Sequence, residues 1–329
     1  MVNLKITSAD PFRVLESTRS VLEDARFVFI KEENIPILAG QIRNRFPQGV
    51  SLEQIGFRST GDPEKDIQRI FIENNVNFCF WAGKGREKWK VEWPKGNLID
   101  GGWYGLAACF DRALAENIPI LDANYLASIS DADVRNFFRS ANNTEIPLIK
   151  ERTNNLREAG RVLIEKFGGK AINIVEKGDY DAVKIIKLII DNFSSFRDIS
   201  ILDERKIFFL KRAQLCPNDF NYILKQHGKE IKNLDVLTAF ADYKIPQILR
   251  NEGILEYSPE LAEKVDNFVE ISRDSREEIE IRAATIWGTE LLRQEIKNLS
   301  SREIDNAILL ISQDQKGIKP YHRTRTIFY

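Results

Sequence analysis

The sequence is poor in the residues that metal and redox sites most often use. Among its 329 residues there are only two histidines and three cysteines. His227 and His322 are too few for a multi-histidine metal centre, whereas Cys79, Cys109 and Cys216 lie far apart and form no C-x-x-C pair. We therefore expect three buried thiols, no metal site, and a solvent-facing side chain for His227, which lies in a polar turn.

Motifs of several large enzyme classes are also missing. The chain has no G-x-x-x-x-G-K-S/T, no G-x-G-x-x-G after a strand, no H-E-x-x-H and no G-x-S-x-G. Nucleoside-triphosphate, dinucleotide and zinc-protease functions therefore lack their usual support.

Long apolar runs and an excess of basic charge are absent as well. No apolar run reaches the roughly 20 residues of a membrane-spanning helix. The N-terminal residues show neither the apolar core nor the cleavage site of a secretion signal. The net charge of -1 is unlike that of a protein that grips a nucleic-acid backbone. We expect a cytoplasmic protein with a small-molecule partner, no stable nucleic-acid partner and no membrane association.

What the chain does contain is typical of a folded, mainly helical protein. Hydrophobic residues make up 43% of it and charged residues 29%. Capping residues and apolar spacing predict helices from Asp10 to about Ala25, after Asp62, and from Ser275, where the last long helix begins. Further helices are expected at 106–116, 130–139, 147–167 and 179–191. Because no repeat or linker divides the chain, we predict one compact, mainly α domain over residues 1–329.

Two segments carry the aromatic and β-branched alternation of strands. Residues 77–81 and 89–93 are separated by a glycine-containing turn and predict a small β-hairpin. A shorter extended piece, 206–210, leads directly into Lys211 and Arg212.

The most unusual polar residue is Asp242, an acid between two aromatic side chains, Phe240 and Tyr243, in an otherwise apolar stretch. A catalytic carboxylate explains it, but so does a helix cap before Pro246 or an ion pair with Lys244. The segment alone does not separate these explanations.

Two further segments concentrate cations. Lys211 and Arg212 follow four apolar residues, and the C-terminal segment 319–329 contains His322 and Arg323. Each set has a simple structural explanation, namely surface exposure at the end of a strand for the first and an edge strand or solvated tail for the second.

Taken together, ten segments in this order resemble the queuosine salvage proteins, a family of queuosine 5'-phosphate N-glycosylases/hydrolases. The resemblance covers most of the chain. The segments are NFCFW (77–81), GLAAC (105–109), RAL (112–114), NIPI (117–120), EKFGG (165–169), FRD (196–198), KRAQ (211–214), FADYKIPQ (240–247), EIR (280–282) and YHRTR (321–325).

The resemblance implies a helical fold similar to that of helix-hairpin-helix DNA glycosylases, with a lysine and an aspartate facing the glycosidic bond. Lys211 and Asp242 match those positions. It also implies hydrolysis of queuosine 5'-monophosphate to queuine and ribose 5-phosphate, with queuine returned to transfer-RNA modification. No metal or organic cofactor is implied.

The chain departs from the family at one element. Where the family has D-x-x-x-W-D, this chain keeps the first acid as Asp305 but has Leu309 and Leu310 in place of the tryptophan and the second acid. If that element holds the base, the identity of the base stays open.

Cleaving a ribosyl C–N bond builds positive charge on the sugar, which a carboxylate stabilises or attacks. We assign that role to Asp242. Lys211 neutralises the departing base or keeps Asp242 ionised, and both roles require the two side chains to be in contact. Phe240 and Tyr243, together with Asp242, are the candidates for holding the base, with Trp103 a weaker one that core packing also explains.

The matched segments also supply four candidate ligands for the 5'-phosphate. They are Arg212, Lys244, His322 and Arg323.

Three alternatives stay open. A DNA or RNA glycosylase shares the fold and the lysine–aspartate pair, but it needs a basic face and a glycine-rich hairpin that the sequence does not show. A glycosylase acting on a related deazapurine nucleoside or nucleotide, or a catalytically silent nucleoside-binding protein, is equally compatible with the altered element at Asp305.

Overall fold

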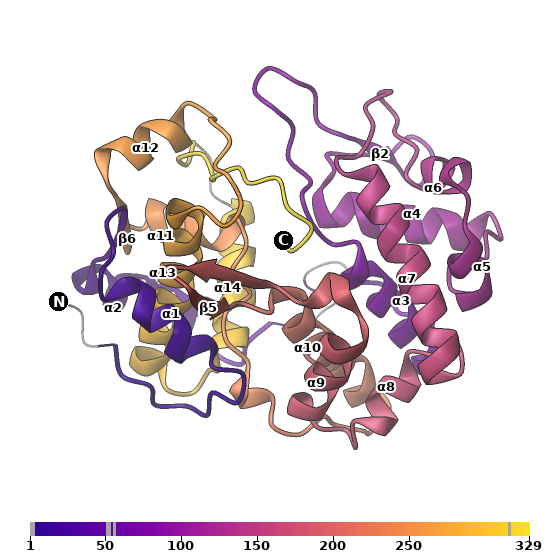
Figure 1. Ribbon diagram of the computed structural model, residues 1–329, viewed down its shortest axis with the longest axis horizontal. Helices are drawn as coiled ribbons and strands as arrows, with labels where there is room; N and C mark the ends of the chain where they lie inside the picture. The colour runs from indigo at the N-terminus through magenta and orange to yellow at the C-terminus, as the bar shows by residue number, and fades with distance from the viewer. Residues whose placement is uncertain (1–3, 51–53, 55–56, 315–316) are drawn as a thin grey trace.

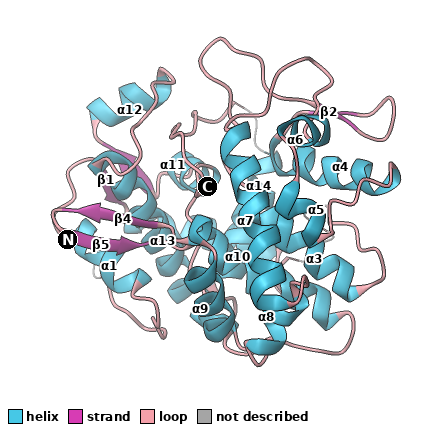
Figure 2. Cartoon of the chain, turned by 45° about the vertical axis from the view of Figure 1, so that its right-hand side comes forward, coloured by secondary structure: helices cyan, strands magenta, loops and turns pink. Residues whose placement is uncertain are grey.

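A computed structural model describes residues 4–50, 54, 57–314 and 317–329. Residues 1–3, part of the N-terminal segment considered for a secretion signal, lie outside this range. Within it, fourteen α-helices are accompanied by three two-stranded antiparallel sheets, which confirms the mainly α class (Figure 2). No helix in these ranges is both long and apolar enough to cross a membrane.

The helices form two groups, seen on the right and the left of Figure 1. We call the group on the right the central lobe. It consists of α3 (Pro63–Asn75), β2 (Val91–Glu92), β3 (Leu98–Ile99), α4 (Gly102–Ala115), α5 (Ala123–Ser128), α6 (Asp131–Phe137), α7 (Ile149–Phe167), α8 (Ile172–Lys177), α9 (Ala182–Asn192), α10 (Lys211–Lys225) and the 3-10 turns Ser194–Phe196 and Leu234–Val236.

The group on the left, which we call the terminal lobe, combines both ends of the chain. Its elements are α1 (Val14–Leu22), β1 (Val28–Ile30), the 3-10 turn Glu32–Asn34, α2 (Ile35–Arg45), α11 (Lys244–Asn251), β6 (Leu255–Tyr257), α12 (Pro259–Asp266), α13 (Arg276–Ile296) and α14 (Ser301–Asp314). The hairpin β4 (Ile199–Leu202) and β5 (Arg205–Phe208) leaves the central lobe and packs on α1 and α13.

Local capping explains where the predicted helices begin. The side chains of Asp62, Ser130 and Ser275 accept hydrogen bonds from first-turn N–H groups of α3, α6 and α13, as expected. The first helix begins at Val14 and not at Asp10, because Arg13 adopts a left-handed conformation (φ 59°). Nor is α13 the last long helix, since α14 follows it.

The predicted hairpin of residues 77–81 and 89–93 is wrong. Residues 77–81 form no strand, because Cys79 has φ 45° and the buried Arg152 guanidinium donates to the carbonyls of Val76, Phe78 and Cys79. The second segment does contribute a strand, β2, but it pairs with β3, with Val91 opposite Ile99.

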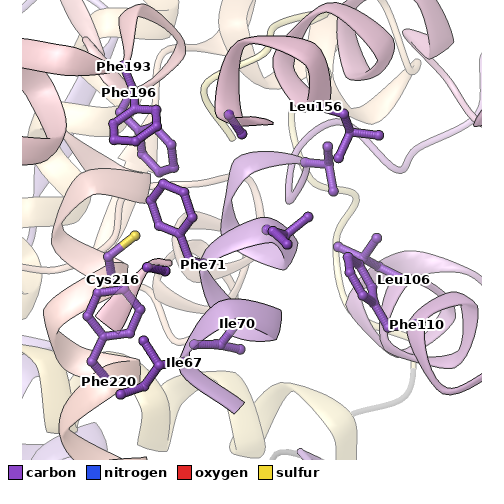
Figure 3. Close-up of a cluster of buried hydrophobic side chains, with 14 of the residues drawn as sticks. Ile67, Ile70, Phe71, Leu106, Phe110, Leu156, Phe193, Phe196, Cys216 and Phe220 are labelled. Carbon is purple, nitrogen blue, oxygen red and sulfur yellow. The ribbon is translucent and has the colours of Figure 1, made fainter. Parts of the chain in front are cut away.

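Each lobe has an apolar core of its own. In the central lobe, Phe71 stacks on Phe196 (ring centroids 5.7 Å apart) and meets the edge of Phe193 (5.0 Å), as Figure 3 shows. The same cluster contains Cys109 and Cys216. All three cysteines are buried free thiols and His227 is exposed, which confirms both expectations.

The C-terminal tail, residues 317–329, runs between the lobes (Figure 1). The Cys79 N–H donates to the Tyr329 carbonyl (2.8 Å), and the Tyr329 hydroxyl donates to Glu278 Oε1 on α13 (2.8 Å). The segment is therefore a tail, as one explanation had it, but its last two aromatic residues, Phe328 and Tyr329, are buried.

Candidate active site

A cavity of about 330 Å³ lies where the two lobes meet. One face each of α3, α10 and α14 lines it, together with the start of α4 and the segment that enters α11; Figure 2 shows α10 and α14 close together in the middle of the molecule. The side chains with polar atoms on its wall are those of Asn74, Asn77, Trp103, Tyr104, Lys211, Asp219, Asp242, Tyr243, Lys244, Asp305, Asn306 and Ser312.

Lys211 is the first residue of α10. Leu210 before it takes a left-handed conformation (φ 52°), which turns the chain from the β5 side into the helix. The Lys211 side chain is only 7% exposed, so surface exposure at the end of a strand does not describe it. Burial lowers the pKa of the Lys211 ammonium group, while the carboxyl groups of Asp242 and Asp305 oppose that shift.

Asp242 both caps a helix and lines the cavity. Its Oδ1 accepts hydrogen bonds from the N–H groups of Lys244 (2.6 Å) and Ile245 (3.0 Å), in the first turn of α11. Asp242 therefore does cap a helix, as one explanation proposed, but that helix begins at Lys244, two residues before Pro246. Capping occupies one oxygen, and the carboxylate still forms part of the cavity wall.

Lys211 and Asp242 face the same cavity without touching. Among the ion pairs of the described residues there is none between them, although the Asp242 carboxyl group acts electrostatically on Lys211. The direct contact expected from sequence is therefore absent, although both side chains line the same cavity.

Asp305, on α14, lines the cavity, although we predicted no catalytic role for it from the sequence. It is 4% exposed, and its Oδ1 accepts the N–H of Phe240 (2.9 Å). Burial, and next the charge of Asp242, raise the pKa of Asp305 to about 8, against the opposing effects of the Phe240 amide and Lys211. Asp305 is thus an un-ionised acid at neutral pH, placed beside Asp242.

Asp219 is the third carboxyl group on the cavity wall, and sequence reasoning missed it altogether. It lies eight residues after Lys211, so it falls on the same face of α10, a relation visible only once α10 is known to be a helix. Its oxygens accept hydrogen bonds from the Asn74 amide (2.7 Å) and the Asn218 amide (3.0 Å).

The predicted aromatic residues do line the cavity. Phe240 is buried, and Tyr243 packs against Tyr321 with ring centroids 4.9 Å apart. For Trp103 the sequence was compatible with both core packing and base binding. Its side chain lines the cavity and also packs on the core of the central lobe.

Only one of the four predicted phosphate ligands lines the cavity. It is Lys244. The Arg212 guanidinium is buried and bonded to the carbonyls of Asn74, Asn75 and Ser195.

The other two candidates belong to the tail and lie outside the cavity wall. His322 is buried, which lowers its pKa to about 3 and keeps it neutral. The Arg323 guanidinium lies over the Phe268 ring, 4.3 Å from its centroid.

A buried ion pair links the segments that carry Asp242 and Lys211. Arg282, on α13, donates to both oxygens of Asp198 (2.9 and 2.6 Å) and to the carbonyl of Ala241 (3.2 Å). Asp198 in turn accepts the backbone N–H of Lys211 (3.1 Å). One guanidinium thereby links the residue before Asp242 to the start of α10.

At the element that departs from the family, Leu309 lines the cavity, whereas Leu310 packs with the core of the terminal lobe. Among the described residues, no group of three or more His, Cys, Asp or Glu side chains is arranged to hold a metal ion.

Comparisons with known proteins give a family and several relatives. A family model described as "Queuosine salvage protein" matches residues 57–329. A protein of Sphaerobacter thermophilus named queuosine 5'-phosphate N-glycosylase/hydrolase is 38% identical, over 97% of this chain and 98% of its own. Proteins of the same name from Bos taurus and Mus musculus are each 34% identical, over 95% and 97% of this chain and 98% and 99% of theirs.

Proposed function

The chain belongs to the queuosine salvage protein family, and from that membership and the cavity we propose that it hydrolyses the N-glycosidic bond of queuosine 5'-phosphate and releases queuine for salvage. The proposal rests on one observation. Lys211, from the central lobe, lines the same cavity as Asp242 and Asp305, from the terminal lobe. A carboxylate that stabilises positive charge on the ribose and an acid that protonates the departing base both favour cleavage of a ribosyl C–N bond.

Asp242 acts at the anomeric carbon. As the C–N bond breaks, its electron pair leaves with the base and positive charge develops on the ribose, which the Asp242 carboxylate stabilises or attacks. Water then adds to the anomeric carbon and gives up a proton to the carboxylate. The products are queuine and ribose 5-phosphate.

Asp305 and Lys211 act on the departing base. With a pKa of about 8, Asp305 carries a proton at neutral pH and donates it to the base nitrogen as the bond breaks. The buried Lys211 ammonium group stabilises the negative charge that would otherwise form on the base.

Binding is divided between an apolar wall and a positive end. Phe240 and Tyr243 stack on the flat base. Lys244 and the amide groups at the start of α4, which line the cavity at Gly102, bind the 5'-phosphate, because a helix N-terminus favours an anion.

These two phosphate ligands lie at the same end of the cavity. Lys88 acts electrostatically on Lys244 and pairs with Asp100 (3.5 Å), two residues before α4 begins.

Incubation of the protein with queuosine 5'-monophosphate, followed by mass spectrometry of the released base, tests the proposal. Asp242→Asn should abolish release while the circular dichroism spectrum stays that of the wild type. Asp235→Asn, at an exposed aspartate outside the cavity wall, is the matched control and should remain active. Wild-type turnover by Asp242→Asn contradicts the mechanism.

The same experiment distinguishes the alternatives. Binding without release indicates a silent nucleoside-binding protein, and release only from another nucleotide indicates a different deazapurine substrate. A gel shift with duplex and single-stranded oligonucleotides tests the proposed lack of a nucleic-acid partner. We also propose a cytoplasmic location, in keeping with three buried free thiols.

A further inference from the structure

The cavity continues along α10 well beyond the catalytic groups. Lys211, Leu215 and Asp219 are spaced by four residues, and all three line it. Eight residues of α-helix span about 12 Å. Asp219 therefore marks a second end of the cavity, two helical turns from the lysine beside which the glycosidic bond is cleaved.

The carboxylate of Asp219 is an uncompensated buried charge. Its side chain is 6% exposed, and its hydrogen-bond donors are the neutral amides of Asn74 and Asn218. No ion pair to Asp219 occurs among the described residues; Lys211 acts on it only at longer range, and the nearby Glu73 is also acidic. Burying an unpaired carboxylate is costly, which indicates that a ligand supplies the missing positive charge.

Asp219 titrates below neutral pH despite its burial. Burial raises the pKa of Asp219 to about 6, against the opposing hydrogen bonds from the two asparagine amides, so the group is mainly ionised at pH 7. An anionic end of this kind repels a phosphate group, which fits the placement of the 5'-phosphate at the Lys244 end.

On the premise of the proposed function, the group that reaches this end belongs to the base. Queuine is a 7-deazaguanine whose five-membered ring carries an aminomethyl arm ending in a cyclopentene diol. Its secondary amine, when protonated, is a cation, and its two hydroxyls both donate and accept hydrogen bonds.

We propose that Asp219, with Asn74 and Asn306, forms a specificity subsite for the cationic secondary amine and the diol of the base substituent. Asn306 lies on α14 next to Asp305 and lines the same cavity, and its amide contacts the Tyr222 hydroxyl (3.4 Å). No donor to the side-chain oxygen of Asn306 occurs among the described residues, which leaves this oxygen available to a diol hydroxyl while Asp219 pairs with the amine.

The test compares two substrates that differ only in the arm. Release of base is measured for queuosine 5'-monophosphate and for 7-deazaguanosine 5'-monophosphate, which lacks the arm. A charge-assisted hydrogen bond is worth roughly ten- to a hundredfold in affinity, so the wild type should prefer the first substrate by about that factor in kcat/KM.

Asp219→Asn should lower kcat/KM for queuosine 5'-monophosphate by about tenfold or more, mainly through KM, and leave the armless substrate nearly unchanged. An equal loss for both substrates overturns the subsite and makes Asp219 structural. Asn306→Ala leaves the hydrogen bonds of Asp219 intact and should cause a smaller loss of the preference for queuosine 5'-monophosphate. This second variant tests the subsite if Asp219→Asn does not fold.

The two proposals fail in different ways. Release from both nucleotides with equal efficiency by the wild type overturns the subsite alone. Release from neither overturns the proposed function and the subsite with it.

Discussion

Three aspartates line the same cavity, yet their carboxyl groups are held differently. Asp242 accepts two backbone N–H groups, Asp305 accepts one, and Asp219 accepts two side-chain amides. Burial is the leading cause of the raised pKa of both Asp305 and Asp219, but the nearby charges differ. One residue type can therefore serve as carboxylate, proton donor and cation ligand within a single site.

The proposed proton donor predicts a pH dependence. Asp305, with a pKa of about 8, is protonated below that pH and loses its proton as the pH rises through it. Single-turnover release of queuine should therefore decline above pH about 8 and remain high below it, as far down as the other groups allow. Asp305→Asn should lower the rate by about a hundredfold or more, because an amide cannot donate this proton.

Lys211 provides the internal check on that assignment. Its charge lowers the pKa of Asp305, so Lys211→Met should slow the reaction and also move the alkaline decline to higher pH. Lys225→Met, at the exposed last position of the same helix, should change neither the rate nor the profile. A wild-type rate that stays flat from pH about 7 to about 9.5 contradicts the role of Asp305.

Part of the site was readable from individual residues. Asp242 is conspicuous as an acid in an apolar stretch, and the resemblance added Lys211. Arg212 and His322 looked from sequence like equally good phosphate ligands. In the structure the buried Arg212 guanidinium donates to backbone carbonyls, and burial keeps His322 neutral. Which of several similar cations faces a cavity depends on tertiary packing that no local pattern encodes.

At the scale of elements, the Asp198–Arg282 pair joins the start of α10, the segment before Asp242 and α13. Arg282→Lys should lower the free energy of unfolding by about 3 kcal/mol, because one ammonium group cannot bond both Asp198 oxygens and the Ala241 carbonyl, and a buried charge is left poorly paired. The rate of queuine release should fall as well, since both catalytic segments lose a shared anchor.

Urea unfolding and single-turnover kinetics measure the two effects. Arg135→Lys, on α6, is the control, because Arg135 and its ion-pair partner Glu145 are both more than half exposed. That change should stay within about 1 kcal/mol. Equal losses in the two variants argue against a special role for the buried pair.

Elements whose ends are set by neighbouring residues could be predicted from sequence, whereas elements whose conformation depends on residues far away in the chain could not. The caps at Asp62, Ser130 and Ser275 lie within three residues of the groups they bond, so sequence suffices. The conformation of residues 77–81 depends on Arg152, more than seventy residues away. The helix α10 was hidden by Pro217 in its interior, and with it the shared face of Lys211 and Asp219.

At the scale of the whole molecule, the cavity exists only where the two lobes meet. Lys211 and Asp219 come from the central lobe, whereas Asp242 and Asp305 come from the terminal lobe. The tail adds contacts across the same boundary, where Trp81 Nε1 donates to the Thr324 carbonyl (3.3 Å). Each lobe has its own core, so the single domain that we propose rests on these shared contacts.

We predict that the chain nevertheless unfolds in one cooperative transition. The Asp198–Arg282 pair and the buried tail are lost if either lobe opens alone, and opening would expose Phe240, Phe328 and Tyr329. Differential scanning calorimetry should give a single peak whose calorimetric and van't Hoff enthalpies agree. Two resolved peaks contradict the single domain.

A ligand that contacts both lobes must stabilise both together. In the inactive Asp242→Asn variant, queuosine 5'-monophosphate at about a hundred times its dissociation constant should add about 2.7 kcal/mol to the free energy of unfolding and move the whole transition upward. Free ribose 5-phosphate, expected at the Lys244 end only, should stabilise far less at the same concentration. A shift confined to part of the transition would show that the lobes bind and unfold independently.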